Sequence, residues 1–149
     1  MALNARGQLP LPLPDVRTAP PTNADQLVGL ASWLWIDPAQ WRGLSKTVLI
    51  PGVAATVTAR PTSITWRTGD GQTVQCNGPG TPYIAGAPDQ NQHSDCTHTY
   101  LDRGPVTATV TVHWKMDWSA TTGQAGTFGL VDRTTNFPLT VAEVQAVTN

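Results

Sequence analysis

The chain has 149 residues, 40% of them hydrophobic and 13% charged, with a formal net charge of −1. Such a chain is long enough to bury one core of ordinary size, and its charge balance excludes the basic surface of a nucleic-acid-binding protein. Thirteen glycines, thirteen prolines and short apolar runs rich in Val and Thr indicate an all-β domain, and no run reaches the roughly 18 apolar residues of a membrane helix.

Residues 1–26 are expected to form a Pro-rich N-terminal arm or linker. In Leu9-Pro10-Leu11-Pro12-Leu13-Pro14, each proline removes a backbone donor and favours extended geometry in the residue before it, so polyproline II conformation is expected. The arm either lies along its own domain, or Leu9, Leu11 and Leu13 enter pockets on another protein. We predict that it is an interaction element, because three leucines exposed for no reason would be a liability.

From Leu27 the pattern becomes that of strands. Val28 to Ile36 carries Trp33 and Trp35, which a period of two places on the same face, and Trp41 follows in a turn-rich segment. Two further strands, or one strand broken by a bulge at Pro51-Gly52, are expected over Thr47 to Ile50 and Val53 to Ala59.

A hairpin and a long excursion are expected next. Pro61 marks a corner, after which alternation resumes at Ile64 and leads into the turn Gly69-Asp70-Gly71, a strong hairpin signal. The strand Thr73 to Cys76 returns, and Asn77 to Asp95 is irregular. Cys76 and Cys96 flank this excursion, which could not pack well alone, so we predict a disulfide that stabilises the fold by roughly 3 kcal/mol. The alternative is two free thiols in a reduced protein.

The clearest strand is Val106 to Trp118, where apolar and polar residues alternate strictly. Ser119 to Gly126 is expected to be a turn, and a last strand follows, with a bulge near Ala142. Trp66, Trp114 and Trp118 fall on the core side of their strands. About seven strands with regular turns predict a sandwich.

Three pieces of the chain follow one another: Trp66 ahead of Gly69-Asp70-Gly71, then His98-Thr99-Tyr100, then the Val–Thr strand. Together they resemble the signature of PKD (polycystic kidney disease) domains and stand in that family's order. The resemblance covers residues 44–147 and implies an immunoglobulin-like PKD-type β-sandwich over residues 27–149. It implies structural roles for Trp66, Gly69, Asp70, Gly71, His98 and Tyr100, with Tyr100 as a tyrosine corner that ties a crossover loop to the backbone.

A second resemblance involves four segments: Val28 to Trp35, Cys76 to Tyr83, Ser94 to Tyr100 and Val141 to Gln145. They are similar to a family of secreted actinobacterial proteins of unknown function, whose members are often labelled ATP/GTP-binding. No phosphate loop supports nucleotide binding, because neither Gly69-Asp70-Gly71 nor Gly78-Pro79-Gly80 is followed by the required lysine. This likeness implies an extracellular or cell-envelope location.

Residues suited to chemistry gather around the excursion, but not at useful spacings. No DxDxD or HxxxH pattern concentrates metal ligands among Asp70, Asp89, Asp95, Asp102, His93 and His98. Ser94-Asp95 beside His93 has the residue types of a triad, but a triad needs separated supports. We therefore expect no metal, no cofactor and no enzymatic activity.

The sequence thus predicts a non-enzymatic module that binds or assembles with another secreted or cell-envelope protein. One alternative is recognition of a cell-wall or other polysaccharide, in which the rings of Trp33, Trp35 or Trp41 stack on sugars. A second alternative is a passive spacer domain.

Overall fold

The computed structural model describes residues 9–144, and positions 1–8 and 145–149, including the start of the expected arm, lie outside the described residues. The described chain forms two β-sheets with two short 3-10 turns and no α-helix, which confirms the predicted all-β sandwich. The smaller sheet has the order β1-β3-β7 and contains β1 (Val16–Ala19), β3 (Ala31–Ile36) and β7 (Thr97–Thr99). The larger has the order β2-β9-β8-β5-β4, with β6 beside β5, and contains β2 (Gln26–Leu27), β4 (Leu44–Ile50), β5 (Val53–Arg67), β6 (Thr73–Cys76), β8 (Gly104–Ala120) and β9 (Ala125–Ala142).

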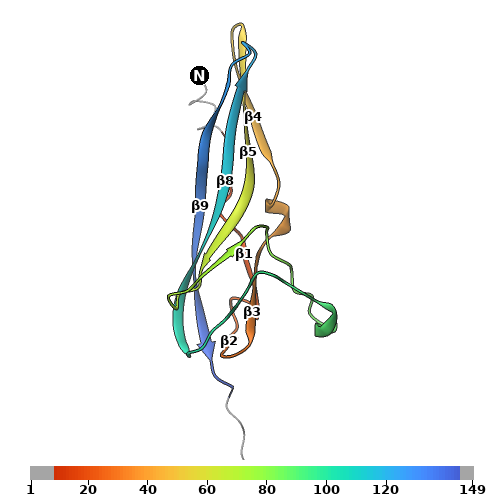
Figure 1. The fold of residues 1–149 in the computed structure, drawn as a ribbon, viewed down its shortest axis with the longest axis vertical. Helices are drawn as coiled ribbons and strands as arrows, with labels where there is room; N and C mark the ends of the chain where they lie inside the picture. Colours follow the sequence, from red (N-terminus) through yellow and green to blue (C-terminus); the bar gives the residue numbers. More distant parts are fainter. Residues whose placement is uncertain (1–8, 145–149) are drawn as a thin grey trace, which may run out of the picture.

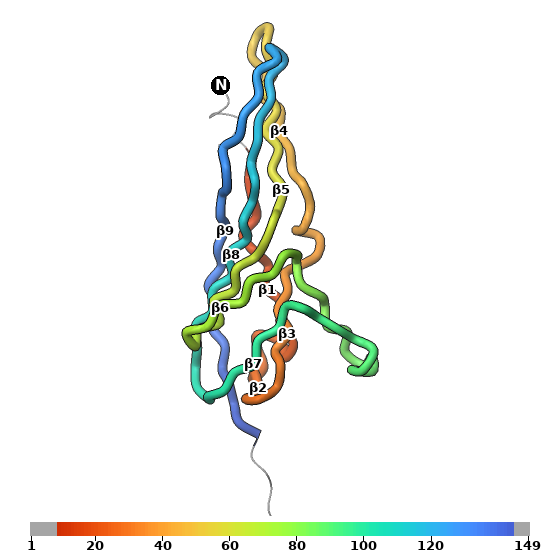
Figure 2. The backbone as a smooth tube through the Cα atoms, in the orientation of Figure 1, coloured from red at the N-terminus to blue at the C-terminus, as the bar shows by residue number. Residues whose placement is uncertain are grey.

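The two sheets differ in length. Strands β4, β5, β8 and β9 form a long blade, and the smaller sheet lies beside its lower half (Figure 1; the backbone trace of Figure 2 shows the same arrangement). The turns that join β4 to β5 and β8 to β9 lie together at the far end of the blade. Only the lower half therefore has the two layers of a sandwich.

Strict alternation on β8 produces the core face of the blade. Ala108, Val110, Val112, Trp114 and Met116 are buried, and the residues between them are more exposed. They pack with apolar residues of β3, β5 and β9 in one core cluster. Trp66 and Trp114 are each 1% exposed, whereas Trp118 is only partly buried against the cluster.

Two sequence predictions about irregularities were wrong. Pro61 does not end a strand, because β5 continues past it and absorbs it in a register shift between Pro61 and Ser63 opposite β8. A bulge tolerates proline, which cannot donate to the ladder, and the hydroxyl of the extra residue, Thr62, donates to the carbonyl of His113 instead. The bulge expected near Ala142 is absent there. The shift between β8 and β9 lies between Met116 and Asp117.

The segment expected to be a Pro-rich arm or linker lies along its own domain and is part of the sandwich, which is one of the two alternatives that the sequence left open. Leu9 and Leu11 are 7% and 9% exposed and belong to the core cluster, whereas Leu13 is 57% exposed. Strand β1 pairs antiparallel with β3. The docking interpretation is therefore wrong for Leu9 and Leu11. The blade is longer than the small sheet, so its core face needs a further cover, and these two leucines provide it.

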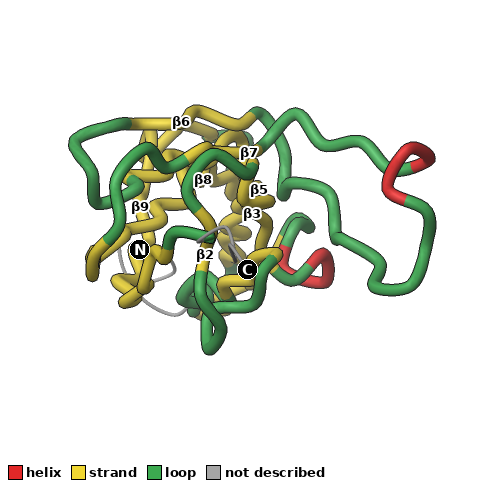
Figure 3. Tube along the Cα trace, turned by 90° about the horizontal axis from the view of Figure 1, so that it is seen from below, coloured by secondary structure: helices red, strands yellow, loops and turns green. Residues whose placement is uncertain are grey.

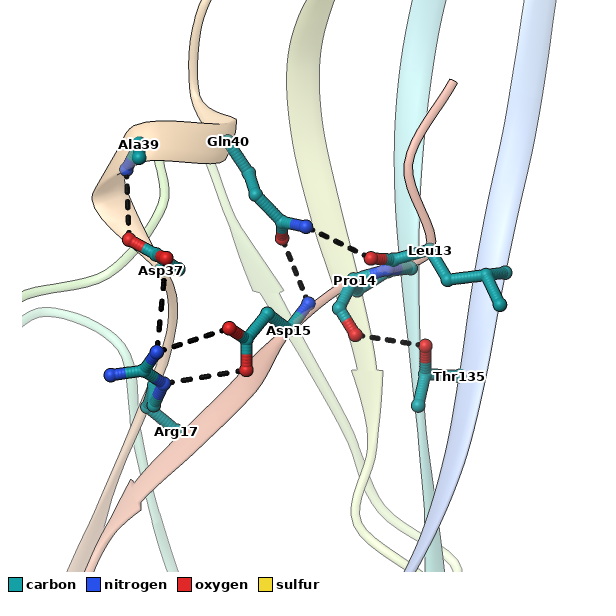
Figure 4. Close-up of polar contacts among 8 residues, drawn as sticks. All are labelled: Leu13, Pro14, Asp15, Arg17, Asp37, Ala39, Gln40 and Thr135. Carbon is teal, nitrogen blue, oxygen red and sulfur yellow. Dashed lines mark hydrogen bonds and ion pairs between the residues drawn. The ribbon is translucent and has the colours of Figure 1, made fainter. Parts of the chain in front are cut away.

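Polar contacts anchor this strap, residues 9–15, where it enters β1 (Figure 4). The side chain of Gln40 donates to the carbonyl of Leu13 at 2.9 Å and accepts from the amide of Asp15 at 2.8 Å. The hydroxyl of Thr135 on β9 donates to the carbonyl of Pro14 at 2.9 Å. The strap is thus tied both to the 3-10 turn η1 (Pro38–Gln40) and to the blade.

Candidate functional site

An apolar groove of about 660 Å³ lies between β3, the excursion and the turn that follows β1. We call it the aromatic groove, and the lining residues that matter here are Pro20, Pro21, Trp33, Trp35, Tyr83 and Asp89. The excursion extends sideways from the body of the protein, as the view along the blade shows (Figure 3). One wall of the groove therefore belongs to the sandwich and another to the loop.

The sandwich wall follows from alternation on β3. Leu34 and Ile36, each 1% exposed, point into the core, so Trp33 and Trp35 share the opposite face. Trp33 is half-buried and Trp35 is 9% exposed, and both line the aromatic groove. Their shared face, predicted from the sequence, is the groove side of the small sheet.

The excursion is fixed to β3 at both of its ends. Cys76 and Cys96 form the predicted disulfide, with an S–S distance of 2.00 Å and a sequence separation of 20. The amide of Leu34 donates to the carbonyl of Cys96, and the amide of Ile36 donates to the carbonyl of Pro79. β3 thus continues its hydrogen bonding beyond β7 onto the base of the loop.

Gly80 allows this close approach. Its φ is +85°, and a Cβ atom placed there would lie 2.3 Å from the carbonyl oxygen of Leu34 and 2.7 Å from Cβ of Trp35. Any side chain would meet both a strained backbone and a backbone clash. The glycine therefore sets how closely the excursion lies against the sandwich wall.

The tip of the excursion carries the third ring. Tyr83 meets Trp33 edge to face, with ring centroids 5.2 Å apart and ring planes at 81°. Its hydroxyl donates to Oδ1 of Asp89 at 2.5 Å, and this hydrogen bond, together with desolvation, raises the pKa of Tyr83 above its usual value. The side chain of Gln92 bonds both the amide and the carbonyl of Ile84. These contacts hold the loop around the ring.

The third wall is a turn held by a buried glutamine. Gln26 is fully buried, and its amide nitrogen donates to the carbonyl of Pro20 at 2.8 Å. The hydroxyl of Thr18 donates to the same carbonyl, and Ser32 donates to the Gln26 side-chain oxygen. Because buried amides are costly to leave unpaired, this network fixes Pro20 and Pro21 at the rim.

Of the sequence-predicted binding residues, Trp33 and Trp35 are the two that line the aromatic groove. Trp41 follows η1 and packs against the core cluster, so it is not part of the aromatic groove. Tyr83 was missed as a site residue, and Asp89 was considered only as a metal ligand and set aside. The predicted disulfide could have pointed to Tyr83, since an aromatic side chain inside a tethered loop must lie near the domain to which the loop is attached.

The residues of the PKD-like signature form a separate cluster that joins the two sheets. Oδ1 of Asp70 accepts from the hydroxyl of Thr68 at 2.5 Å, and Oδ2 lies 2.7 Å from Nε2 of His98 on β7. The hydroxyl of Tyr100 donates to the carbonyl of Thr68 at 2.7 Å, 32 residues away in the chain, whereas a tyrosine corner bonds the backbone only a few residues upstream. The rings of His98 and Tyr100 meet edge to face.

The remaining signature residues surround this cluster. Trp66 lies in the core against Phe137, with ring centroids 6.2 Å apart. Gly69 and Gly71 both have positive φ values in the turn, and a Cβ atom on Gly69 would lie 2.7 Å from the carbonyl oxygen of Thr107. Burial, followed by the charge of Asp70, raises the pKa of Tyr100 to about 12. The geometry of the cluster therefore suits a structural role.

A carboxylate, an imidazole and a hydroxyl line up on the outer face of the blade. Nδ1 of His113 lies 2.7 Å from Oδ1 of Asp132, and Nε2 lies 2.7 Å from the hydroxyl of Thr65, which also donates to Gln75. No pattern in the sequence predicts this row. Acyl transfer also needs an oxyanion site and a substrate cleft, and the aromatic groove is lined by other residues. The row connects β6, β5, β8 and β9.

Within residues 9–144, no group of three His, Cys, Asp or Glu side chains is arranged to hold a metal ion. The same part of the chain contains no helix long and apolar enough to cross a membrane. Comparison of the chain with family models, with curated proteins and with solved structures found no match.

Proposed function

We propose that this chain is a non-enzymatic binding module of the extracellular space or cell envelope, and that the aromatic groove is its binding surface. The observation that supports this most is the meeting of Trp33, Trp35 and Tyr83 in an open groove. Water-exposed aromatic surface costs about 25 cal/mol per Å² relative to burial. Concave apolar sites with a few polar groups are the usual form of ligand sites.

Contacts outside the groove also hold its walls. The disulfide and Gly80 fix the excursion wall, and the amide of Gln26 fixes the turn at Pro20 and Pro21, so the binding surface is formed before a ligand arrives. Preorganisation of this kind lowers the entropy cost of association. A passive spacer has no use for such a supported groove.

The proposed extracellular or cell-envelope location and the resemblance to PKD domains have support of their own. A disulfide in a small domain is typical of oxidising compartments, and the PKD-like residues form a cluster suited to such a sandwich. A secreted or cell-envelope partner is the counterpart we propose. Leu9 and Leu11 take no part in the binding surface, because they are buried in their own domain.

Polysaccharide binding is the second candidate, favoured by the two tryptophans in the groove. Extended sugar chains stack on roughly coplanar rings, whereas Trp33 and Tyr83 stand at 81°. Trp41 does not join the other two tryptophans, since it packs against the core. A corner of rings is better suited to one compact apolar group than to a chain of sugars.

The proposal is tested by titrating the protein, observed by NMR, with a panel of short peptides, cell-wall oligosaccharides and small organic ions. We expect at least one class to shift signals of the groove and to lose binding in Trp33→Ala. Leu130→Ala is the matched control, because Leu130 is an exposed apolar residue elsewhere on the blade. If every interaction in the panel survives Trp33→Ala, the groove is not the binding surface and the proposal fails.

A further inference from the structure

We infer that the aromatic groove recognises the trimethylammonium group of a small choline-like cation. This inference rests on the proposed function and names the ligand class of the same groove. It is carried by the angle of the rings, by the charge of the lining and by the state of the polar groups around it.

The rings form a corner. Trp33 and Tyr83 are perpendicular, with centroids 5.2 Å apart, and Trp35 lines the same groove. The face of an aromatic ring carries negative potential, so a cation placed over it is attracted. Because the edge of one ring meets the face of the other, a compact cation in the corner contacts the open face of the edge-on ring and the rim of its partner. Aromatic cages bind quaternary ammonium groups through such ring faces.

The charge of the lining has the matching sign. Asp89 is the single charged residue among the described residues that line the groove, and no Lys or Arg joins it. Its Oδ1 atom accepts from the hydroxyl of Tyr83, which places the carboxylate beside the ring. A cation therefore gains both the ring faces and the carboxylate, whereas an anion would be repelled.

The polar groups of the groove distinguish between kinds of cation. The hydroxyls of Thr18 and Tyr83 already donate within the protein, and both ends of the Gln92 amide are bonded there. A primary ammonium has three N–H donors that need acceptors. The single carboxylate of Asp89 cannot accept all three, and leaving the others unpaired in an apolar groove is costly. A trimethylammonium group has no N–H donor, so its methyl shell fits the lining. Sugar hydroxyls have the same difficulty as a primary ammonium.

The test is titration of the full chain with choline chloride and, in parallel, with 3,3-dimethylbutanol, which has the same shape without the charge. Binding is followed by calorimetry and by the indole signals of the tryptophans, at matched ionic strength. We expect choline to bind about tenfold more tightly than the neutral alcohol. Glycine betaine, which adds a carboxylate, should bind more weakly than choline.

Two variants of the excursion provide the matched comparison. Asp89→Asn should weaken choline binding by up to about fivefold and leave the alcohol unchanged. Asp95→Asn removes the same charge from the same loop, but Asp95 lies outside the aromatic groove and its side chain is 96% exposed, so it should change neither. Trp33→Ala should abolish binding of choline, and Trp33→Phe should retain part of it.

Other outcomes separate this inference from the proposed function. Equal affinity for choline and 3,3-dimethylbutanol, or equal effects of the two Asp variants, would overturn recognition of the cation. If choline does not bind while a peptide or oligosaccharide binds in a manner that needs Trp33, the ligand class is wrong and the binding module remains. If nothing in either experiment depends on Trp33, both fail.

Discussion

Nε2 of His98 lies 2.7 Å from Oδ2 of Asp70, although 28 residues separate them in the chain. The contact joins strand β7 of the small sheet to the turn between β5 and β6 of the large one. Asp70 therefore does more than shape its own turn, which was the role expected from the sequence. The cluster around it makes stability depend on pH.

Asp70 should contribute stability that disappears in acid. Partial burial raises its pKa, but hydrogen bonds from Thr68, from His98 and from the amide of Gln72 outweigh burial and hold the pKa below the ordinary 3.8. The unfolded chain thus binds this proton more readily, so the contribution is complete above 3.8 and is lost as pH falls through the lower folded value. We expect urea midpoints of the wild type to exceed those of Asp70→Asn at about pH 5, and the gap to close towards about pH 2.

Asn also favours the turn conformation, so Asp70→Asn should remain folded. Asp95→Asn is the control, because its side chain is 96% exposed. A gap between wild type and Asp70→Asn that stays constant with pH would contradict the assignment.

Tyr100→Phe should cost about 1 to 3 kcal/mol, because it leaves the buried carbonyl of Thr68 without its donor. Tyr83→Phe, in the exposed loop, should cost much less. In an alkaline spectrophotometric titration, Tyr100 should ionise last, because its pKa is raised to about 12. Similar unfolding free energies for the two variants in urea would rule out the buried role of Tyr100.

Leu11→Ala should destabilise the domain by about 2 kcal/mol, since Leu11 packs in the core cluster. Leu13→Ala should stay within about 0.5 kcal/mol, because Leu13 is 57% exposed. Denaturant melts of the two variants test whether the strap covers the blade. Equal and small losses of stability in the two variants would mean that Leu11 does not pack on the blade and that the segment is a free arm.

Trp114→Ala should cost about 3 to 5 kcal/mol, as truncation of a fully buried aromatic does. His113→Ala, one residue earlier on β8, loses its contacts with Asp132 and Thr65 but leaves no core cavity, so about 1 kcal/mol is expected. Urea melts give the unfolding free energies of the two variants. Equal values would mean that the faces of β8 are assigned wrongly.

Replacing both cysteines by alanine should lower stability by roughly 3 kcal/mol, because the bond closes a loop with a sequence separation of 20. It should also weaken any binding at the aromatic groove while the sandwich is still folded, because the excursion carries Tyr83 and Asp89. Near-UV circular dichroism reports the fold, and NMR titration reports the groove. Unchanged binding in this variant would mean that the loop does not depend on its tether.

Local pattern alone determined much of the architecture. Alternation on β8 fixed which side of Val106 to Trp118 is core, because successive side chains of a strand point to opposite faces. The same rule placed Trp33 and Trp35 together. Asp-Gly marked the hairpin turn, and the two cysteines flanking an unpackable loop indicated the disulfide. Each of these features follows from residues that are close in the sequence, so it can be predicted from the sequence alone.

Tertiary structure decided where the strap lies and what faces Trp33. The exposed or buried state of Leu9 depends on the blade being longer than the small sheet, which no local pattern records. Tyr83 reaches Trp33 because the disulfide, Gly80 and the hydrogen bonds of β3 fold the excursion back. Long-range contacts of this kind arise only when the whole chain packs, so the aromatic groove is a product of the tertiary structure and of no local pattern.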